Sequence, residues 1–256
     1  MKRLVPIFLI VLLVGAVLAG WHYRTFLSAL IRGRLEVVQL GGKARPDPQA
    51  NEEAKSEVER WRKDLERRYQ SAPDEGGRQE VLREASLFLE TILPDLMASW
   101  LGTPWDFNGT AEGPGEKPIA CGYFVATVLR DAGFRLDRYQ LAREPSQAIL
   151  RTFVPRSSMK LRVGVPYERF CEEIRSLPPG VSIIGLDTHV GFLVTGPEGF
   201  HFIHSSGSKP WCVVDETESK AQVLMRSNYR VYGSITDDLE IARRWIEGER
   251  FSGPRS

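Results

Sequence analysis

Residues 180–195 have the sequence GVSIIGLDTHVGFLVT and predict two β-strands separated at Asp187-Thr188. A turn follows at residues 196–199, GPEG, and leads into the apolar segment 200–206. A third strand can therefore return antiparallel beside the second. Together these segments predict an antiparallel sheet.

Two histidines of this predicted sheet are expected to meet. His189 opens the second strand, and His204 lies at the far end of the third. Because strand side chains alternate between faces, positions 200, 202 and 204 share one face and positions 201 and 203 the other. We therefore expect His204 beside His189, and His201 on the opposite face as a packed or surface residue. No acidic or cysteine cluster completes a metal site with it, so no metal is expected.

Upstream of the strands, a helix is predicted to begin at a cysteine. Residues 118–124, PIACGYF, lead into apolar positions three and four apart, and Gly133 is placed to stop the helix. Cys121 falls in or just before the first turn, where free N–H groups and the helix dipole favour thiolate over thiol. Gly122 would let a substrate approach the backbone closely. A thiol with an imidazole base, held by a further polar group, is the arrangement of nucleophilic catalysis.

These residues resemble the NlpC-type papain-like cysteine peptidases and amidases, which cut bacterial cell-wall peptides. The resemblance covers about residues 86–235. GTPWDFNG at 102–109 stands where the family has G-T-P-Y-x-W-G-G, and THVGF at 188–192 and IHS at 203–205 are similar to its H-V-G-I-Y and I-H-A. The resemblance implies an α+β papain-like fold, with Cys121 as nucleophile, His189 as general base and His204 as the orienting third residue.

The sequence departs from the family pattern around the thiol. The usual D-C-S-G is Ala120-Cys121-Gly122-Tyr123 here, which removes the acidic and hydroxyl neighbours that often hold the free amine of a peptide. Trp105 stands at the family's oxyanion tyrosine, and an indole N–H can only donate. Trp105 either packs in the core or faces the substrate. We name Trp105, Gly122 and Tyr123 as candidate substrate-binding residues, and the backbone N–H of Cys121 as the better oxyanion donor.

The start of the chain predicts export. Lys2-Arg3 precede an uncharged apolar run at residues 4–21, LVPIFLIVLLVGAVLAGW. Its 18 residues reach the lower end of a membrane span, about 17–25, and also suit a signal peptide. The basic residues place the N-terminus in the cytoplasm and the remaining chain across the membrane. We expect residues 1–24 to anchor the protein in a bacterial inner membrane, with the rest in the cell envelope.

Four segments are predicted along the chain. They are the anchor or signal at 1–24, a polar linker at 25–50, a charged amphipathic helix at 51–75, and the hydrolase domain at 76–250. The narrow apolar stripe of the charged helix either packs on the domain or, at residues 51–70, binds a protein partner. Within the domain we expect helices at 81–96, 146–150, 167–177 and 239–247, strands at 211–214 and 228–235, and an inserted loop at 138–160.

Composition limits the function. The 34 basic and 33 acidic residues give a formal net charge of +1, which argues against nucleic acid as a partner. Cys171 and Cys212 either pair or stay free, while Cys121 stays reduced. Without any cofactor, the chain is expected to cleave an amide bond of peptidoglycan stem peptides. A thiol acyltransferase, an amidase with a non-wall substrate and an inactive envelope scaffold are the alternatives.

Overall fold

A computed structural model describes residues 44–253 of the chain. The predicted anchor at 1–24 and most of the predicted linker lie outside these residues. Residues 45–253 form one compact unit. Within 44–253, no helix is both long enough and apolar enough to cross a membrane.

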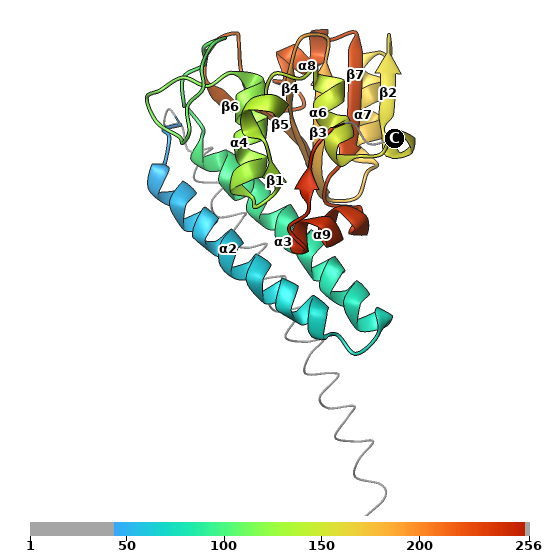
Figure 1. Cartoon of the computed structure of the whole chain (residues 1–256). Helices are drawn as coiled ribbons and strands as arrows, with labels where there is room; N and C mark the ends of the chain where they lie inside the picture. Colours follow the sequence, from blue (N-terminus) through green and yellow to red (C-terminus); the bar gives the residue numbers. More distant parts are fainter. Residues whose placement is uncertain (1–43, 254–256) are drawn as a thin grey trace, which may run out of the picture. The chain divides into compact units, whose positions relative to one another are not determined.

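The predicted antiparallel sheet is confirmed, and it has six strands (Figure 1). The strand order is β2-β7-β3-β4-β5-β6, and every neighbouring pair is antiparallel. The strands are β2 (Lys160–Val163), β3 (Gly180–Leu186), β4 (Val190–Gly196), β5 (Gly199–Ser205), β6 (Val213–Thr217) and β7 (Tyr229–Ser234).

Both faces of the sheet are covered, which explains why the central strand has a continuous apolar sequence. β3 is buried at every position. Val181 and Ile183 point into the larger core, while Ile184 and Leu186 point into a smaller one. The helices behind the larger core include α3 (Glu75–Ser99), α4 (Cys121–Asp131), α6 (Ser146–Phe153) and α9 (Leu239–Ile246). Those at the smaller core are α7 (Tyr167–Arg175) and α8 (Gln222–Arg226).

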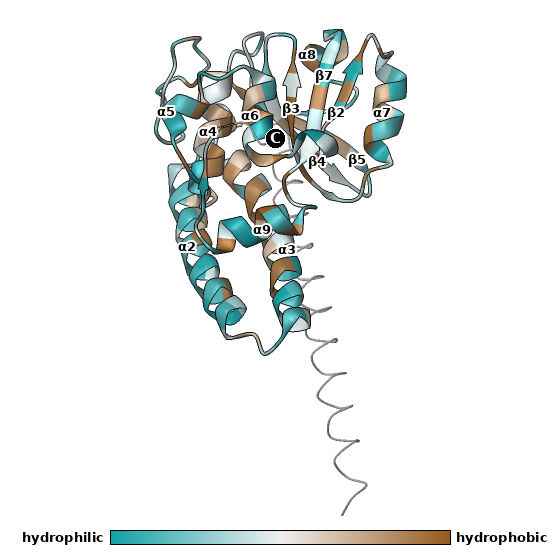
Figure 2. Cartoon of the chain, turned by 45° about the vertical axis from the view of Figure 1, so that its right-hand side comes forward, coloured by the Kyte–Doolittle hydropathy of each residue, from teal (hydrophilic) through white to brown (hydrophobic). Residues whose placement is uncertain are grey.

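The charged helix predicted at 51–75 is α2 (Pro48–Ser71), and it packs on the domain. It starts earlier than expected because the Asp47 side chain accepts the Ala50 N–H and a proline occupies the first turn. Its apolar stripe, including the buried Val58 and Leu65, joins the larger core. In Figure 2, α2 is coloured largely hydrophilic while apolar colour gathers on α3 and α4. A protein partner at this helix stays a prediction, and it would contact the charged face.

The region expected to be an inserted loop is largely structured. It holds α5 (Arg138–Leu141), α6, a 3₁₀ turn at 156–158 and the start of edge strand β2. A further pair, β1 (Arg135–Leu136) with β8 (Arg250–Phe251), is parallel and was not predicted, because two-residue strands carry no periodic pattern. α6 packs on β3.

All three cysteines are free, so Cys171 and Cys212 do not pair. Cys171 is buried within α7 in the smaller core. Cys212 lies beside Pro104, in an isolated bridge that precedes β6. The two thiols therefore belong to different packing environments.

We expect Leu65→Ala in α2 to lower the free energy of unfolding of the whole described domain. Leu65 is fully buried in the larger core, and truncating a buried leucine usually costs about 2–5 kcal/mol. Urea unfolding followed by circular dichroism measures it. Arg60→Ala, on the exposed face of α2, is the control and should change stability by less than about 0.5 kcal/mol. A separate early transition of α2 alone would contradict its place in this core.

Candidate active site

The helix predicted around the cysteine begins at Cys121 itself. The chain before it is fixed by hydrogen bonds from three sides. The backbone N–H groups of Ile119 and Ala120 each donate to a carbonyl of the 104–109 segment at 2.9 Å, and the Ser205 hydroxyl at the end of β5 donates to the Ile119 carbonyl at 2.7 Å. The first turn of α4 is thus tied directly to the sheet. Ala120, the N-cap residue, supplies no side-chain cap.

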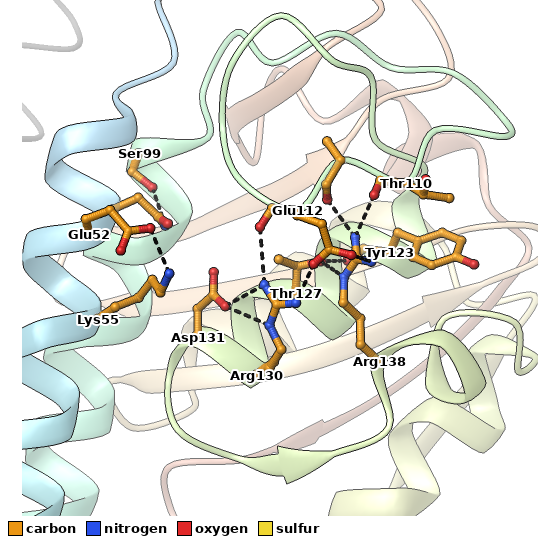
Figure 3. Close-up of polar contacts among 12 residues, drawn as sticks. Glu52, Lys55, Ser99, Thr110, Glu112, Tyr123, Thr127, Arg130, Asp131 and Arg138 are labelled. Atoms are coloured by element: carbon orange, nitrogen blue, oxygen red, sulfur yellow. Dashed lines mark hydrogen bonds and ion pairs between the residues drawn. The ribbon is translucent and has the colours of Figure 1, made fainter.

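The loop that leads to this helix is held by buried arginine contacts (Figure 3). Arg138, almost completely buried, donates to the carbonyls of Thr110 and Ala111 at 3.1 and 2.6 Å. Its Nη1 also donates to Glu112 at 2.8 Å. Arg130 of α4 reaches the other carboxyl oxygen of Glu112 at 2.6 Å. Because one carboxylate is shared by cations from α4 and α5, the loop and both helices are locked together.

The two histidines lie together as the strand alternation predicts. Nε2 of His189 and Nδ1 of His204 are 2.7 Å apart, and the two rings stand at 87°. His204 is fully buried and stacks on Phe202 with ring centroids 4.1 Å apart. The orientation of both rings is therefore set by the sheet.

Glu216 extends this pair, and it was not among the residues predicted from the sequence. Its Oε2 lies 3.1 Å from Nε2 of His204. Glu216 stands on β6, where it is the register partner of Phe202. The sequence predicted a strand at 211–214, which corresponds to β6. Because that strand was predicted to end at residue 214, its continuation to Thr217 beside β5 was missed. An acidic residue two positions further along that strand was the available signal.

A glycine makes room for this arrangement. A Cβ at Gly191 would lie 2.8 Å from the Cβ of His204 and 2.8 Å from the Phe202 ring. Real Cβ atoms do not approach so closely, so any side chain here would displace the stacked pair. The glycine in the THVGF segment is thus explained by packing against His204.

The thiol lies beside the start of β4 but is not hydrogen-bonded to either imidazole among the described residues. The backbone N–H of Val190, the residue directly after His189, is close enough to act on the ionisation of the Cys121 thiol. Cys121 is half-buried and packs against the larger core. The structure therefore joins His189 to His204 by a hydrogen bond, and places Cys121 near the backbone at the start of β4.

The ionisation of the thiol differs from the sequence prediction. Burial raises the pKa of the Cys121 thiol, although the N–H groups of Val190 and Gly122 act in the opposite direction. The expected preference for thiolate was wrong, because desolvation of the sulfur outweighs the donors at the helix start.

The histidines and Glu216 are also shifted by burial. Burial lowers the pKa of His204 to about 3, and burial together with the His204 ring lowers the pKa of His189 to about 3. Burial, helped by the nearby Asp215 carboxylate, raises the pKa of Glu216 to about 7. Both imidazoles are therefore neutral at pH 7, and Glu216 is near its titration midpoint.

His201 takes no part in this cluster. Its Nδ1 lies 2.7 Å from Oδ1 of Asp215, and this hydrogen bond raises the pKa of His201. Within the part of the chain that the structure describes, no group of three or more His, Cys, Asp or Glu side chains is arranged to hold a metal ion.

The candidate substrate-binding residues fall into two groups of contacts. The Trp105 ring is half-buried and lies 5.4 Å from that of Trp211, which is exposed and has a positive φ of 61°. Tyr123 meets Tyr139 edge-on at 5.8 Å. A Cβ at Gly122 would lie 2.3 Å from the carbonyl oxygen of Ala142. The close approach at Gly122 is thus made by α5, and a substrate contact there stays a prediction.

The described residues supply a nucleophile type, two linked imidazoles and a carboxyl group around the start of α4 and β4. Such a set suits acyl transfer through a thiol. Searches of protein-family models, of curated proteins and of solved structures each found no match to this chain.

We expect Gly191→Ala to destabilise the fold by about 1–3 kcal/mol, the usual result of overpacking a buried site. The added methyl would push His204 from Phe202. Gly196→Ala, in the same strand, is the matched control, because a Cβ there meets no atom within 4 Å and its φ is not positive. Thermal unfolding compares the two, and equal stabilities would show that Gly191 is not required by the histidine pair.

The pKa shifts predict how the histidines titrate. From pH 8 to pH 5 the rings of His189 and His204 should stay neutral, while His201 becomes protonated at a pH above 6.5. NMR titration of the assigned ring resonances checks this, with His201 as internal reference. Conversion of His189 to the doubly protonated, charged imidazolium near pH 6.5 would contradict its burial.

The same pKa shifts predict how the stability of the fold changes with pH. Between about pH 6.5 and pH 3 the unfolded chain binds protons that the folded His189 and His204 do not, so their contribution to stability falls as the pH falls through this window. Glu216 acts oppositely: its contribution falls as the pH rises from 4.5 to about 7.

Proposed function

We propose that this protein is a cysteine hydrolase of the bacterial cell envelope that cleaves an amide bond in peptidoglycan stem peptides. The proposal is supported by the hydrogen-bonded pair of His189 and His204, which adjoins the residue Val190 whose backbone N–H acts on the Cys121 thiol. Residues 1–24 would tether the chain to the membrane. A papain-like, NlpC-type fold is part of the same proposal. The start of α4 at Cys121 and the packing of α4 against β4 and β5 support it.

The reaction follows from which ring nitrogens are occupied. Nε2 of His189 is used by His204, so Nδ1 is the nitrogen that takes the thiol proton. The Cys121 sulfur attacks the carbonyl carbon as that proton passes to Nδ1, and the imidazolium then protonates the leaving amine. A water molecule, deprotonated by His189, next attacks the thioester. This step releases the carboxylic acid and restores the thiol.

The raised pKa of the Cys121 thiol favours proton transfer during attack over a preformed thiolate–imidazolium pair. His189 is neutral and can accept the proton. The hydrogen bond between thiol and base would form when substrate is bound, as is common in enzymes whose free structures hold these groups apart. Backbone N–H groups at the start of α4 would stabilise the oxyanion.

The bond cleaved depends on what replaces the family's usual neighbours. Ala120 and Tyr123 offer no carboxylate for a free peptide amine, and the Gly122 backbone is covered by α5. Trp105 and the exposed Trp211 form the aromatic pair in the 104–109 region that precedes the nucleophile. We therefore place substrate selection with aromatic contacts and not with amine recognition.

We expect the purified full-length protein to release new fragments from peptidoglycan peptides, whereas the Cys121→Ala variant releases none. Mass spectrometry of the products identifies the bond from the mass change. Cys212→Ala removes another partly buried thiol and should keep activity, which makes it the matched control.

Three results would decide among the alternatives. Fragments that also appear with Cys121→Ala would exclude this residue as nucleophile. An acyl group transferred to an added amine, with no net hydrolysis, would favour the acyltransferase. Unchanged peptidoglycan, together with a Cys121 that does not react with thiol reagents, would favour the inactive scaffold.

A further inference from the structure

A row of hydrogen bonds runs across the sheet from β6, through β5, to the residue that precedes β4. Glu216 of β6 contacts Nε2 of His204 at 3.1 Å, and Nδ1 of His204 contacts Nε2 of His189 at 2.7 Å. The row ends at Nδ1 of His189, for which the described residues provide no hydrogen-bond partner. His204 is fully buried, so no solvent replaces either of its partners.

The protonation state of Glu216 decides which nitrogen donates in each hydrogen bond of this row. A neutral imidazole has one nitrogen that donates and one that accepts. If Glu216 is ionised, it accepts from Nε2–H of His204, whose bare Nδ1 accepts from Nε2–H of His189. The lone pair of His189 Nδ1 is then available for a proton. If Glu216 is protonated and donates, every bond reverses, and Nδ1 of His189 carries a hydrogen.

We propose that Glu216 is a positioning residue whose carboxylate selects the tautomer of His189 through His204, and so decides whether His189 can act as a base. This inference rests on the proposed function, since it concerns the base of that reaction. Glu216 has no hydrogen bond to the thiol among the described residues. It acts only through the two imidazoles.

The surroundings of Glu216 make this selection sensitive to pH. Burial and the Asp215 carboxylate raise the pKa of Glu216 to about 7. Above that pH the carboxylate form of Glu216 predominates, and Nδ1 of His189 carries no hydrogen. Below that pH Glu216 is mostly protonated, and Nδ1 of His189 carries a hydrogen. The other titratable or charged groups on or near this face are His189 just before β4, His204 of β5, Tyr167, Cys171 and Arg175 from α7, and Glu218 after β6.

The test is ring ¹⁵N NMR of His189 and His204 in the full chain from pH 5 to 9, for the wild type, Glu216→Gln and Asp215→Asn. In the wild type, Nδ1 of His189 should change from protonated to bare as the pH passes about 7. Glutamine has no proton to lose, so Glu216→Gln should show no such change. Asp215→Asn removes a neighbouring negative charge and should move the midpoint to lower pH.

Two results would overturn the inference. One is a His189 tautomer that is the same at every pH in wild type and Glu216→Gln. The other is a midpoint unmoved by Asp215→Asn, and this variant also serves if Glu216→Gln does not fold. A tautomer change in a protein without cleavage would sink the proposed function and leave this inference standing. If the protein cleaves its substrate with a kcat that does not change with the tautomer of His189, the proposed function would stand and this inference would fail.

Discussion

The hydrogen bond between His189 and His204 is the interaction on which the rest of the site depends. Two imidazoles in an apolar sheet must satisfy four nitrogens, and unpaired buried polar groups cost about 1–3 kcal/mol each. Pairing at 2.7 Å satisfies one nitrogen of each ring. The second nitrogen of His204 requires Glu216, and the closeness of the rings requires Gly191. The register of β4, β5 and β6 is therefore inseparable from the chemistry proposed for this cluster.

The same sheet also positions Cys121. Ser205, next to His204, donates to the chain just before Cys121, and the backbone N–H of Val190, next to His189, acts on the ionisation of the Cys121 thiol. Behind α4, the Glu112 carboxylate joins two arginines and holds the 104–120 segment in place. α4 packs on β4 and β5, so the helix that begins at Cys121 is held against the strands next to the histidine pair.

Local patterns predicted the parts that local forces determine. Strands β3 to β5, the start of α4 at Cys121 and the meeting of His189 with His204 followed from apolar runs, turn residues and alternation. Glu216 did not, because the end of β6 depends on pairing with β5. The pKa of the Cys121 thiol was wrongly predicted to be lowered. Burial by residues distant in the sequence raises it, and this effect outweighs that of the helix start, which is visible in the sequence. Within 138–160 the short helix at 146–150 was predicted and is α6, whereas α5 was missed because its packing on α4 is a tertiary effect.

Site-resolved alkylation is the most direct test of whether His189 acts as the base for Cys121. The protein would be treated with iodoacetamide at pH 8, and the modified cysteines quantified by peptide mass spectrometry, in wild type and in His189→Ala. If His189 is the base, His189→Ala should slow labelling of Cys121 by about 10²-fold, the lower end of the effect of a positioned base, while labelling of Cys212 is unchanged. Equal labelling of Cys121 in both proteins would contradict it.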